Sequence, residues 1–223
     1  RAKEYVTTAI RFSLRIGVGN GPTNHGAFLL RESARYGCIR ELKIAVEKLK
    51  QARCGNIIPE IQSNLGYALP YAQTPDDVAA VPGRIVRVGE RVETLHDPEF
   101  GASSHVARVI LTAMRADPGR RSAMALAFSE DIVRICRQAG WKVASFSRDD
   151  EPQDIRAREG SSLEWGTGRA IEEAGAVPDV IFDRGSMGKE PIVRVLGSTP
   201  GEVADKALYV SEKLKELKTS EKE

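Results

Sequence analysis

The sequence predicts an α/β fold, and three observations lead to this prediction. From about residue 55 onward, short runs rich in β-branched residues alternate with segments whose apolar residues recur at helical spacing. Several helix starts carry capping signals, and Gly and Pro mark the turns between elements. Apolar residues make up 41% of the 223 residues, which is enough for a substantial core. Such alternation is typical of a sheet covered by helices.

The first 54 residues are predicted to form a helical segment distinct from the rest of the chain. A helix is expected over about residues 2–15, and the glycine-rich stretch 17–22 that follows cannot continue it. A second helical region comes next, and four apolar residues mark its face most clearly: Leu42, Ala45, Val46 and Leu49. The character of the sequence then changes, so we expect a helical segment of residues 1–54 and a domain of residues 55–223.

The domain is predicted to begin with strands and to continue with alternating helices and strands. Residues 57–69 carry apolar side chains at period two, a strand pattern that Pro70 ends. Two short strands are expected within residues 78–92, on either side of Pro82-Gly83. The elements expected next are a helix at 106–114, a strand at 122–128, a helix at 130–139 capped by Ser129, and a strand at 142–147.

The last two helices carry capping-box signals at their starts. Ser161 is followed three residues later by Glu164, and Thr199 is followed in the same way by Glu202. In the second case a proline occupies the first helical position, where its missing N–H costs nothing. Between these helices, residues 179–182 and 192–196 have the pattern of two strands. The final helix is expected to have one apolar face: Val203, Ala207, Val210, Leu214 and Leu217.

Charge and composition exclude several classes of function. The chain holds 33 basic and 31 acidic residues, a net charge of +2, which argues against a protein that coats nucleic acid. Small anions remain possible ligands, because they need only local positive charge. No apolar run approaches the roughly 20 residues of a membrane span, and no signal peptide is visible. The three cysteines form no CxxC pair, which is typical of a protein of the reducing cytoplasm.

The segment just before the predicted helix at 106–114 is a candidate anion site. Ser103, Ser104 and His105 gather where the N–H groups of a first helical turn are unpaired, and the helix dipole favours an anion there. The alternative is structural: Ser103 caps the helix and His105 is solvated.

Two further segments hold cations that suit a phosphate. Arg84 follows the Pro82-Gly83 turn, where glycine allows a ligand to approach the backbone. Asp183, Arg184 and Lys189 lie just after a predicted strand and offer one carboxylate for a metal and two cations for phosphate. Their spacing matches neither a P-loop nor a dinucleotide motif, so no nucleotide site is predicted. The alternative for both segments is structural: each could be a solvated turn.

Together these segments resemble the ThiN-type thiamine-phosphate synthase domain from about Ile57 to Val210. The stretches that carry the resemblance are IPEIQSNLGYALPYA, DVAAVPGRIV, FGASSHVARVILTAM, EGSSLEWGTGRAI and PDVIFDRGSMGKEPIVRVLG. Ahead of them, RAKEYVTTAIRFSLRIGVGNGPTNHG looks like the C-terminal tail of hydroxymethylpyrimidine-phosphate kinase, which is often fused upstream of this domain. The resemblance therefore implies a piece of a longer two-enzyme chain. Kinase activity is not expected, since the kinase body is absent.

The resemblance implies a fold, a reaction and a cofactor. The expected fold is a three-layer α/β/α domain with a mixed, largely antiparallel sheet. The expected reaction joins hydroxymethylpyrimidine pyrophosphate to hydroxyethylthiazole phosphate, with Mg²⁺, and yields thiamine phosphate and pyrophosphate. The two positions that are functionally essential in the family fall here on Arg84 and His105.

The resemblance also suggests where the substrates bind. Arg84, His105, the N–H groups of the helix start and Mg²⁺ would hold the pyrophosphate, with Ser103 and Ser104 as candidate phosphate contacts. The cluster of Asp183, Arg184 and Lys189 would hold the thiazole phosphate. The candidates for contacts with the pyrimidine are Asn64 and Glu164. The metal ligands stay unassigned.

A non-enzymatic alternative and an oligomeric state are also implied. Domains of this family occur behind helix-turn-helix segments as thiamine-phosphate-sensing regulators. Here the first 50 residues lack a DNA-binding helix pair, and Arg84 and His105 are both present, so the enzyme is favoured. The apolar faces of the N-terminal helices predict a homodimer. The fused or associated kinase is the expected protein partner.

Overall fold

The computed structural model describes residues 23–156 and 161–220. Its centre is a seven-stranded sheet in the order β5-β2-β1-β6-β9-β8-β7. Neighbouring strands are antiparallel, apart from the parallel pair β7 and β8. The strands of this sheet are β1 (Leu65–Ala68), β2 (Val78–Ala80), β5 (Glu99–Phe100), β6 (Ser122–Ala127), β7 (Val143–Ser145), β8 (Val180–Asp183) and β9 (Ile192–Gly197). A separate antiparallel hairpin consists of β3 (Ile85–Val88) and β4 (Arg91–Thr94).

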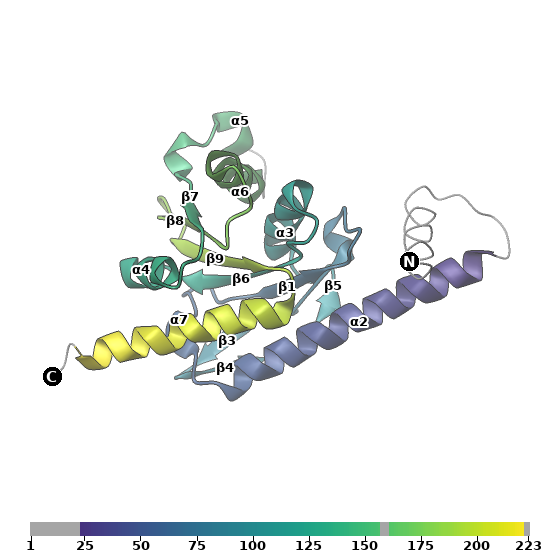
Figure 1. Ribbon diagram of the computed structural model, residues 1–223, viewed down its shortest axis with the longest axis horizontal. Helices are drawn as coiled ribbons and strands as arrows, with labels where there is room; N and C mark the ends of the chain where they lie inside the picture. Colours follow the sequence, from purple (N-terminus) through teal and green to yellow (C-terminus); the bar gives the residue numbers. More distant parts are fainter. Residues whose placement is uncertain (1–22, 157–160, 221–223) are drawn as a thin grey trace.

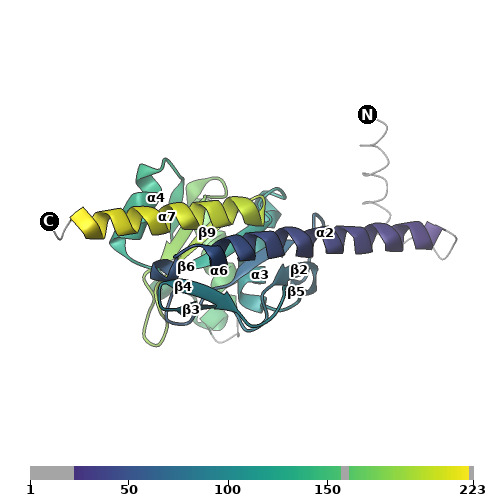
Figure 2. The ribbon, with the colours of Figure 1, turned by 90° about the horizontal axis from the view of Figure 1, so that it is seen from below.

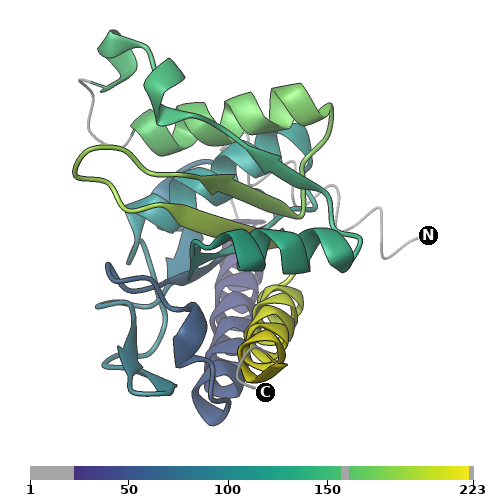
Figure 3. The same ribbon diagram turned by 90° about the vertical axis from the view of Figure 1, so that its left-hand side faces the viewer.

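Helices cover both faces of the sheet, so the domain has three layers (Figures 1 and 3). One face is covered by α2 (Thr23–Gln51), α4 (Glu130–Gln138) and α7 (Pro200–Ser220), and the other by α3 (Ser104–Ala116) and α6 (Ser161–Ala174). The short elements are α5 (Gln153–Arg156) and three 3₁₀ turns at Gly55–Ile57, Pro75–Asp77 and Arg148–Asp150. The predicted α/β/α fold with a mixed, largely antiparallel sheet is therefore confirmed.

Strand β6 shows how the sequence divides the core between the two faces. Met124 and Leu126 belong to the core beneath α2, α4 and α7, whereas Ala123 belongs to the core beneath α3 and α6. Successive side chains of a strand point to opposite faces, so the alanines at alternate positions all turn toward α3 and α6. Small side chains fill less space, and this face of β6 is consequently where the sheet leaves room.

Helices α2 and α7 run side by side across one face, and α2 extends well beyond the sheet (Figure 2). Leu42, Ala45, Val46 and Leu49 are 0–3% exposed and pack in the same core as α7 and the central strands. The second half of α2 thus shares its core with the domain predicted to begin at residue 55. The helix expected at 2–15 and the glycine-rich stretch 17–22 lie outside the described residues.

The predicted strand over residues 57–69 is too long. Only Leu65–Ala68 is a strand, and a 3₁₀ turn occupies Gly55–Ile57. The extended run is broken at Gln62, whose φ of 67° lies in the left-handed region. The period-two pattern was misleading, because all four residues of β1 are buried between the two helical layers. Where two short strands were predicted within 78–92, the structure has three: β2, β3 and β4.

The predicted capping signals are partly confirmed. Ser129 Oγ accepts a bond from the N–H of Ile132 (3.1 Å), and Thr199 Oγ1 accepts one from the N–H of Glu202 (3.2 Å). Glu202, however, accepts from the N–H of Ser198 rather than from Thr199. The described part of α6 begins at Ser161.

Two further expectations from the sequence concern the cysteines and membrane-spanning segments. The three cysteines are buried free thiols, and burial raises the pKa of Cys38 and Cys136 to about 12. Among the described helices, none combines the length and apolar character needed to cross a membrane.

Candidate active site

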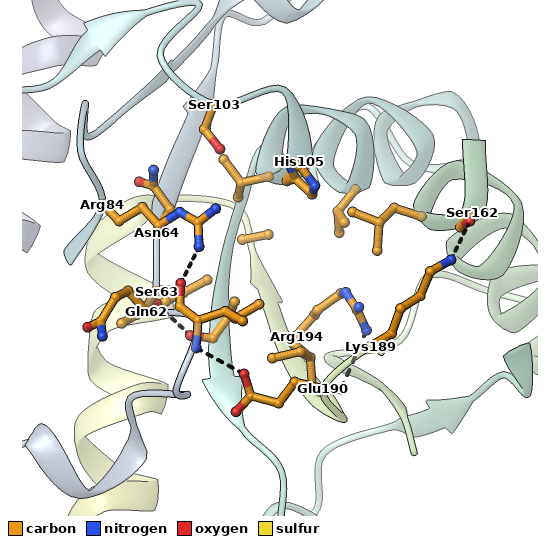
Figure 4. A pocket seen from close by; sticks show the side chains of 18 of the residues that line it. Gln62, Ser63, Asn64, Arg84, Ser103, His105, Ser162, Lys189, Glu190 and Arg194 are labelled. Atoms are coloured by element: carbon orange, nitrogen blue, oxygen red, sulfur yellow. Dashed lines mark hydrogen bonds between the residues drawn. The ribbon is translucent and has the colours of Figure 1, made fainter. Parts of the chain in front are cut away.

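A cavity of about 380 Å³ opens between the sheet and the helices α3 and α6. Its floor includes Ala123 and Ala125 of β6, and Arg194 of β9 lies opposite Ala125 in the strand register. The start of α3, the start of α6, the β8–β9 loop and the segment before β1 complete the wall. Figure 4 shows polar side chains converging on this space from several elements. The small residues of β6 explain why the cavity forms at this point.

Arg84 enters the cavity from a turn that Asn64 holds in place. Asn64 Nδ2 donates to the carbonyl of Val81 (2.8 Å), and its Oδ1 accepts from the N–H of the same residue (2.9 Å). The N–H of Arg84 donates to that carbonyl as well (3.2 Å). Asn64 lines the cavity, but these bonds give its amide the role of fixing the turn. Its expected contact with the pyrimidine stays a prediction.

Backbone strain is concentrated at this wall of the cavity. In the described part of the chain, Gln62 (φ 67°) and Arg84 (φ 71°) are the non-glycine residues with a positive φ, and both line the cavity. Such a conformation costs of order 1–3 kcal/mol and persists only where the surroundings enforce it. The Arg84 guanidinium donates to the carbonyl of Ile61, which fixes its direction. This arrangement holds a permanent cation at the cavity rim.

His105 and Ser103 reach the cavity from the start of α3. Ser103 occupies the N-cap position with an extended backbone, yet its hydroxyl makes no capping bond. In Figure 4 this hydroxyl is turned toward the cavity, and the imidazole of His105 lies beside it on the same wall. Both residues line the cavity, whereas Ser104 is exposed and does not. The predicted anion site before this helix is therefore part of the cavity wall.

Lys189 and Glu190 come from the tight loop between β8 and β9. Gly185 has a φ of 71°, and a Cβ there would lie 2.3 Å from the carbonyl oxygen of Lys189, so the loop requires glycine. Lys189 Nζ donates to Ser162 Oγ (3.3 Å). Glu190 accepts from the N–H groups of Glu60 (2.9 Å) and Ile61 (3.0 Å), which ties the loop to the segment before β1.

Two buried arginines that the sequence reasoning missed also line the cavity. Arg148 and Arg194 are 8% and 5% exposed, and the fully buried Asp183 lies between them. Arg148 binds Asp183 through Nε (2.6 Å) and Nη2 (3.2 Å), and Arg194 Nη1 lies 2.8 Å from the same carboxylate. Burial lowers the pKa of Arg194 from its ordinary value, and Asp183 partly offsets this effect. The sequence signal that could have identified Arg194 is its position as a charged residue within the apolar run of β9.

The other predicted site residues lie outside the cavity. Asp183 does not face it, because the two arginines and the N–H of Gly185 (2.9 Å) occupy its carboxylate. Arg184 points away, pairs with Glu130 and lies over the Phe128 ring at 5.4 Å. Glu164 pairs with Arg115 of α3 instead of facing the cavity.

The donor set of the cavity does not fit a magnesium ion held by the protein. Among the described residues, no three His, Cys, Asp or Glu side chains are grouped so that they could hold a metal. Among the described residues that line the cavity, Glu190 is the one Asp or Glu. Each of its two carboxylate oxygens accepts a hydrogen bond from a backbone N–H group. Mg²⁺ in enzymes is commonly held by one or two carboxylates together with substrate phosphates.

Fold and site together define a three-layer α/β/α domain whose cavity is lined mainly by cationic and apolar groups, an arrangement suited to small anionic ligands. The sequence model of the family described as thiamine-phosphate synthase ThiN matches residues 41–209. The chain therefore belongs to the ThiN family.

Three relatives illustrate this membership. The thiamine-phosphate synthase ThiN of Methanothermobacter thermautotrophicus is 41% identical over 181 residues, which cover 81% of this chain and 95% of the relative. The bifunctional thiamine biosynthesis protein ThiDN of Methanocaldococcus jannaschii is 35% identical over 92% of this chain, which spans only 46% of that protein. A crystal structure of the C-terminal domain of a phosphomethylpyrimidine kinase has 39% identity and a TM-score of 0.74 over 78% of this chain and 98% of that chain.

Proposed function

We propose that this chain is a thiamine-phosphate synthase and that the cavity beneath α3 and α6 is its active site. The observation that carries the proposal is the meeting of Arg84, His105 and Ser103 in one cavity, although they come from separate segments of a chain that belongs to the ThiN family. The substrates would be hydroxymethylpyrimidine pyrophosphate and hydroxyethylthiazole phosphate. The products would be thiamine phosphate and pyrophosphate.

The proposed reaction explains the need for fixed cations. The ring nitrogen of the thiazole forms a bond to the pyrimidine methylene carbon, and the C–O bond to pyrophosphate breaks with its electron pair on the leaving oxygen. Negative charge therefore grows on the pyrophosphate. Arg84 and His105 would stabilise that charge, and the loss of one such preorganised donor commonly costs roughly 3–4 kcal/mol of transition-state stabilisation.

The turn around Arg84 supports this role through preorganisation. Asn64 and the carbonyl of Ile61 fix the turn and the guanidinium before any ligand binds. A donor that is already in place does not have to reorganise as charge develops, which is the condition for strong electrostatic stabilisation.

Three finer expectations stay proposals. Mg²⁺ would serve as a counter-ion to the pyrophosphate, whose oxygens would supply its ligands. One relative is described as bifunctional, and the solved structure is the C-terminal domain of a phosphomethylpyrimidine kinase; for this chain a fused or associated kinase is a proposed partner. The homodimer is a further proposal, and α2 exposes Tyr36 (70%) and Ile44 (62%) for such a contact.

A product assay tests the proposed function. The chain is incubated with both phosphorylated substrates and Mg²⁺, and thiamine phosphate and pyrophosphate are expected in equal amounts. His105→Ala should lower kcat at least a hundredfold, while the matched control His96→Ala, an exposed histidine outside the cavity, should keep it. If the chain forms no product but binds thiamine phosphate tightly, the proposal of a synthase would give way to the alternative of a thiamine-phosphate sensor.

A further inference from the structure

The cavity carries a second group of cations besides Arg84 and His105. Arg194 rises from the sheet floor and Lys189 lies on the α6 side, whereas Arg84 stands on the opposite side (Figure 4). Arg148 joins the group from the 3₁₀ turn after β7. The two phosphorylated substrates of the proposed reaction bring two separate anions, and the two groups of cations match that number.

Among the described residues, the three cations of the second group outnumber the two carboxylates that pair with them. Asp183 bridges the two arginines, and Glu151 lies 4.0 Å from Lys189 Nζ. Among the described residues, Arg148 and Arg194 are buried with these carboxylates, while Lys189 is partly exposed. Because a buried charge is costly unless it is paired, an anion in the cavity would stabilise this arrangement.

The arginines of this group are held rigidly. Asp183 is fully buried and accepts from both guanidiniums and from the N–H of Gly185. The Phe146 ring lies 5.7 Å from the Arg148 guanidinium carbon and 5.5 Å from that of Arg194. Guanidinium groups fixed in this way suit the bidentate recognition of a phosphate.

We infer that Arg194, Lys189 and Arg148 form the subsite for the phosphate monoester of the thiazole substrate, and that Asp183 is the residue that positions the two arginines. This inference rests on the proposed function and adds the residues that distinguish the two substrates. The leaving pyrophosphate stays with Arg84 and His105. The monoester phosphate, which does not react, is anchored on the far side.

Substrate kinetics test the subsite. Arg194→Met and Lys189→Met should each raise the KM for the thiazole phosphate at least tenfold, because a hydrogen bond to a charged group is lost. The KM for the pyrimidine pyrophosphate should change less than threefold. Arg134→Met and Lys213→Met, which remove exposed cations of α4 and α7, are the matched controls and should leave both constants unchanged.

Kinetics with the unphosphorylated thiazole alcohol as substrate distinguish residues that bind the phosphate from residues whose role is merely structural. Both cavity variants should use the alcohol as well as the wild type does, because the missing partner of the lost cation is the phosphate. Asp183→Asn should show the same selective rise in KM, and Arg194→Lys should restore part of the affinity that Arg194→Met loses. Thermal melting identifies any variant that fails to fold, and Lys189, with a side chain 42% exposed, provides a variant without that risk.

Three outcomes would overturn the inference: an equal loss with the alcohol, a rise confined to the KM for the pyrophosphate substrate, or no change in Lys189→Met. The failure of the proposed function is seen separately, as a wild-type chain that makes no product. In that case calorimetry with thiamine phosphate and thiamine still tests the subsite. The wild type should prefer the phosphate, and Lys189→Met should lose the preference.

Discussion

Arg84 has a backbone conformation that is unfavourable for any residue except glycine. Its φ of 71° follows directly on Gly83, whose φ is 73°, so the turn needs two successive left-handed residues. A glycine at position 84 would relieve the strain, which costs of order 1–3 kcal/mol. We propose that an arginine occupies this strained position for the chemistry of its guanidinium.

This leads to a prediction that separates the effect of residue 84 on stability from its effect on activity. Arg84→Gly should be more stable than Arg84→Ala by roughly 1 kcal/mol, because glycine adopts the positive φ without strain. A difference of that size corresponds to about 2–4 °C in Tm for a domain of this length. Both variants should lose activity. Equal Tm values for the two variants in differential scanning calorimetry would contradict the strain argument.

At the level of residues, local patterns in the sequence predicted one side of the cavity better than the other. Ser103 and His105 stand next to a helix start, and Arg84 follows a Pro-Gly turn, so their neighbours along the chain indicate their setting. Arg148, in the turn after β7, and Arg194, on β9, meet only because the sheet places β7 and β9 on either side of β8, which ends at Asp183. That proximity depends on strand order, which short-range patterns do not encode.

At the level of elements, a polar network around Asp179 joins several strands to α7. Lys206 Nζ donates to Asp179 (2.9 Å), Arg120 lies 3.2 Å from the same oxygen, and the N–H of Lys142 binds the other (3.1 Å). Lys206 also pairs with Glu202 (2.9 Å). The network thus ties the starts of β6, β7 and β8 to one helix.

The network predicts how stability depends on pH. Burial alone would raise the pKa of Asp179, but the bonds from Lys206 and Lys142 outweigh it and hold the pKa below its ordinary value of about 3.9. A lowered pKa stabilises the fold above the unfolded-state pKa, and the effect is lost as the pH falls through the folded-state value. Asp179→Asn should therefore lower Tm at pH 7, and the difference should shrink progressively as the pH falls below the unfolded-state pKa of about 3.9. The exposed Asp131→Asn is the control, and a difference that persists unchanged into acid would contradict the account.

Element prediction succeeded where local signals are strong and failed where burial removes them. The helices at 104–116 and 130–138 carry one apolar face each, and their bounds lie within about two residues of the expected ones. Strand β1 is buried on both faces, so its true length could not be taken from alternation. The antiparallel character of the sheet came from the family resemblance, since alternation alone does not determine strand direction.

At the level of the whole molecule, α2 is an integral part of the folded core. Leu42 and Leu49 are fully buried against α7 and the sheet. Replacing such a leucine by alanine costs about 2–5 kcal/mol. A chain that begins at residue 55 should therefore lose its cooperative unfolding transition, and a chain that begins at residue 23 should keep it. Urea denaturation followed by circular dichroism checks both, with Ile44→Ala, at an exposed position of α2, as a neutral control for Leu49→Ala.

The three layers serve the cavity by bringing distant segments together. The antiparallel pairing of β6 with β9 places Arg194 beside a floor of alanines, and α3 delivers His105 to the same space. Arg84 completes the site from outside the main sheet, just before the β3–β4 hairpin. The site therefore requires the assembled domain, and none of its elements could form it alone.

The most direct test of the central claim is the rate at which wild-type protein, Arg84→Ala and Arg87→Ala form thiamine phosphate from the two phosphorylated substrates. Arg87 is an exposed arginine of the neighbouring strand and does not line the cavity. We predict measurable turnover by the wild type and by Arg87→Ala, and a loss of at least a hundredfold in Arg84→Ala with an intact fold, in line with the cost of one preorganised donor. Turnover by Arg84→Ala at the wild-type rate would contradict the assignment of the cavity as the active site.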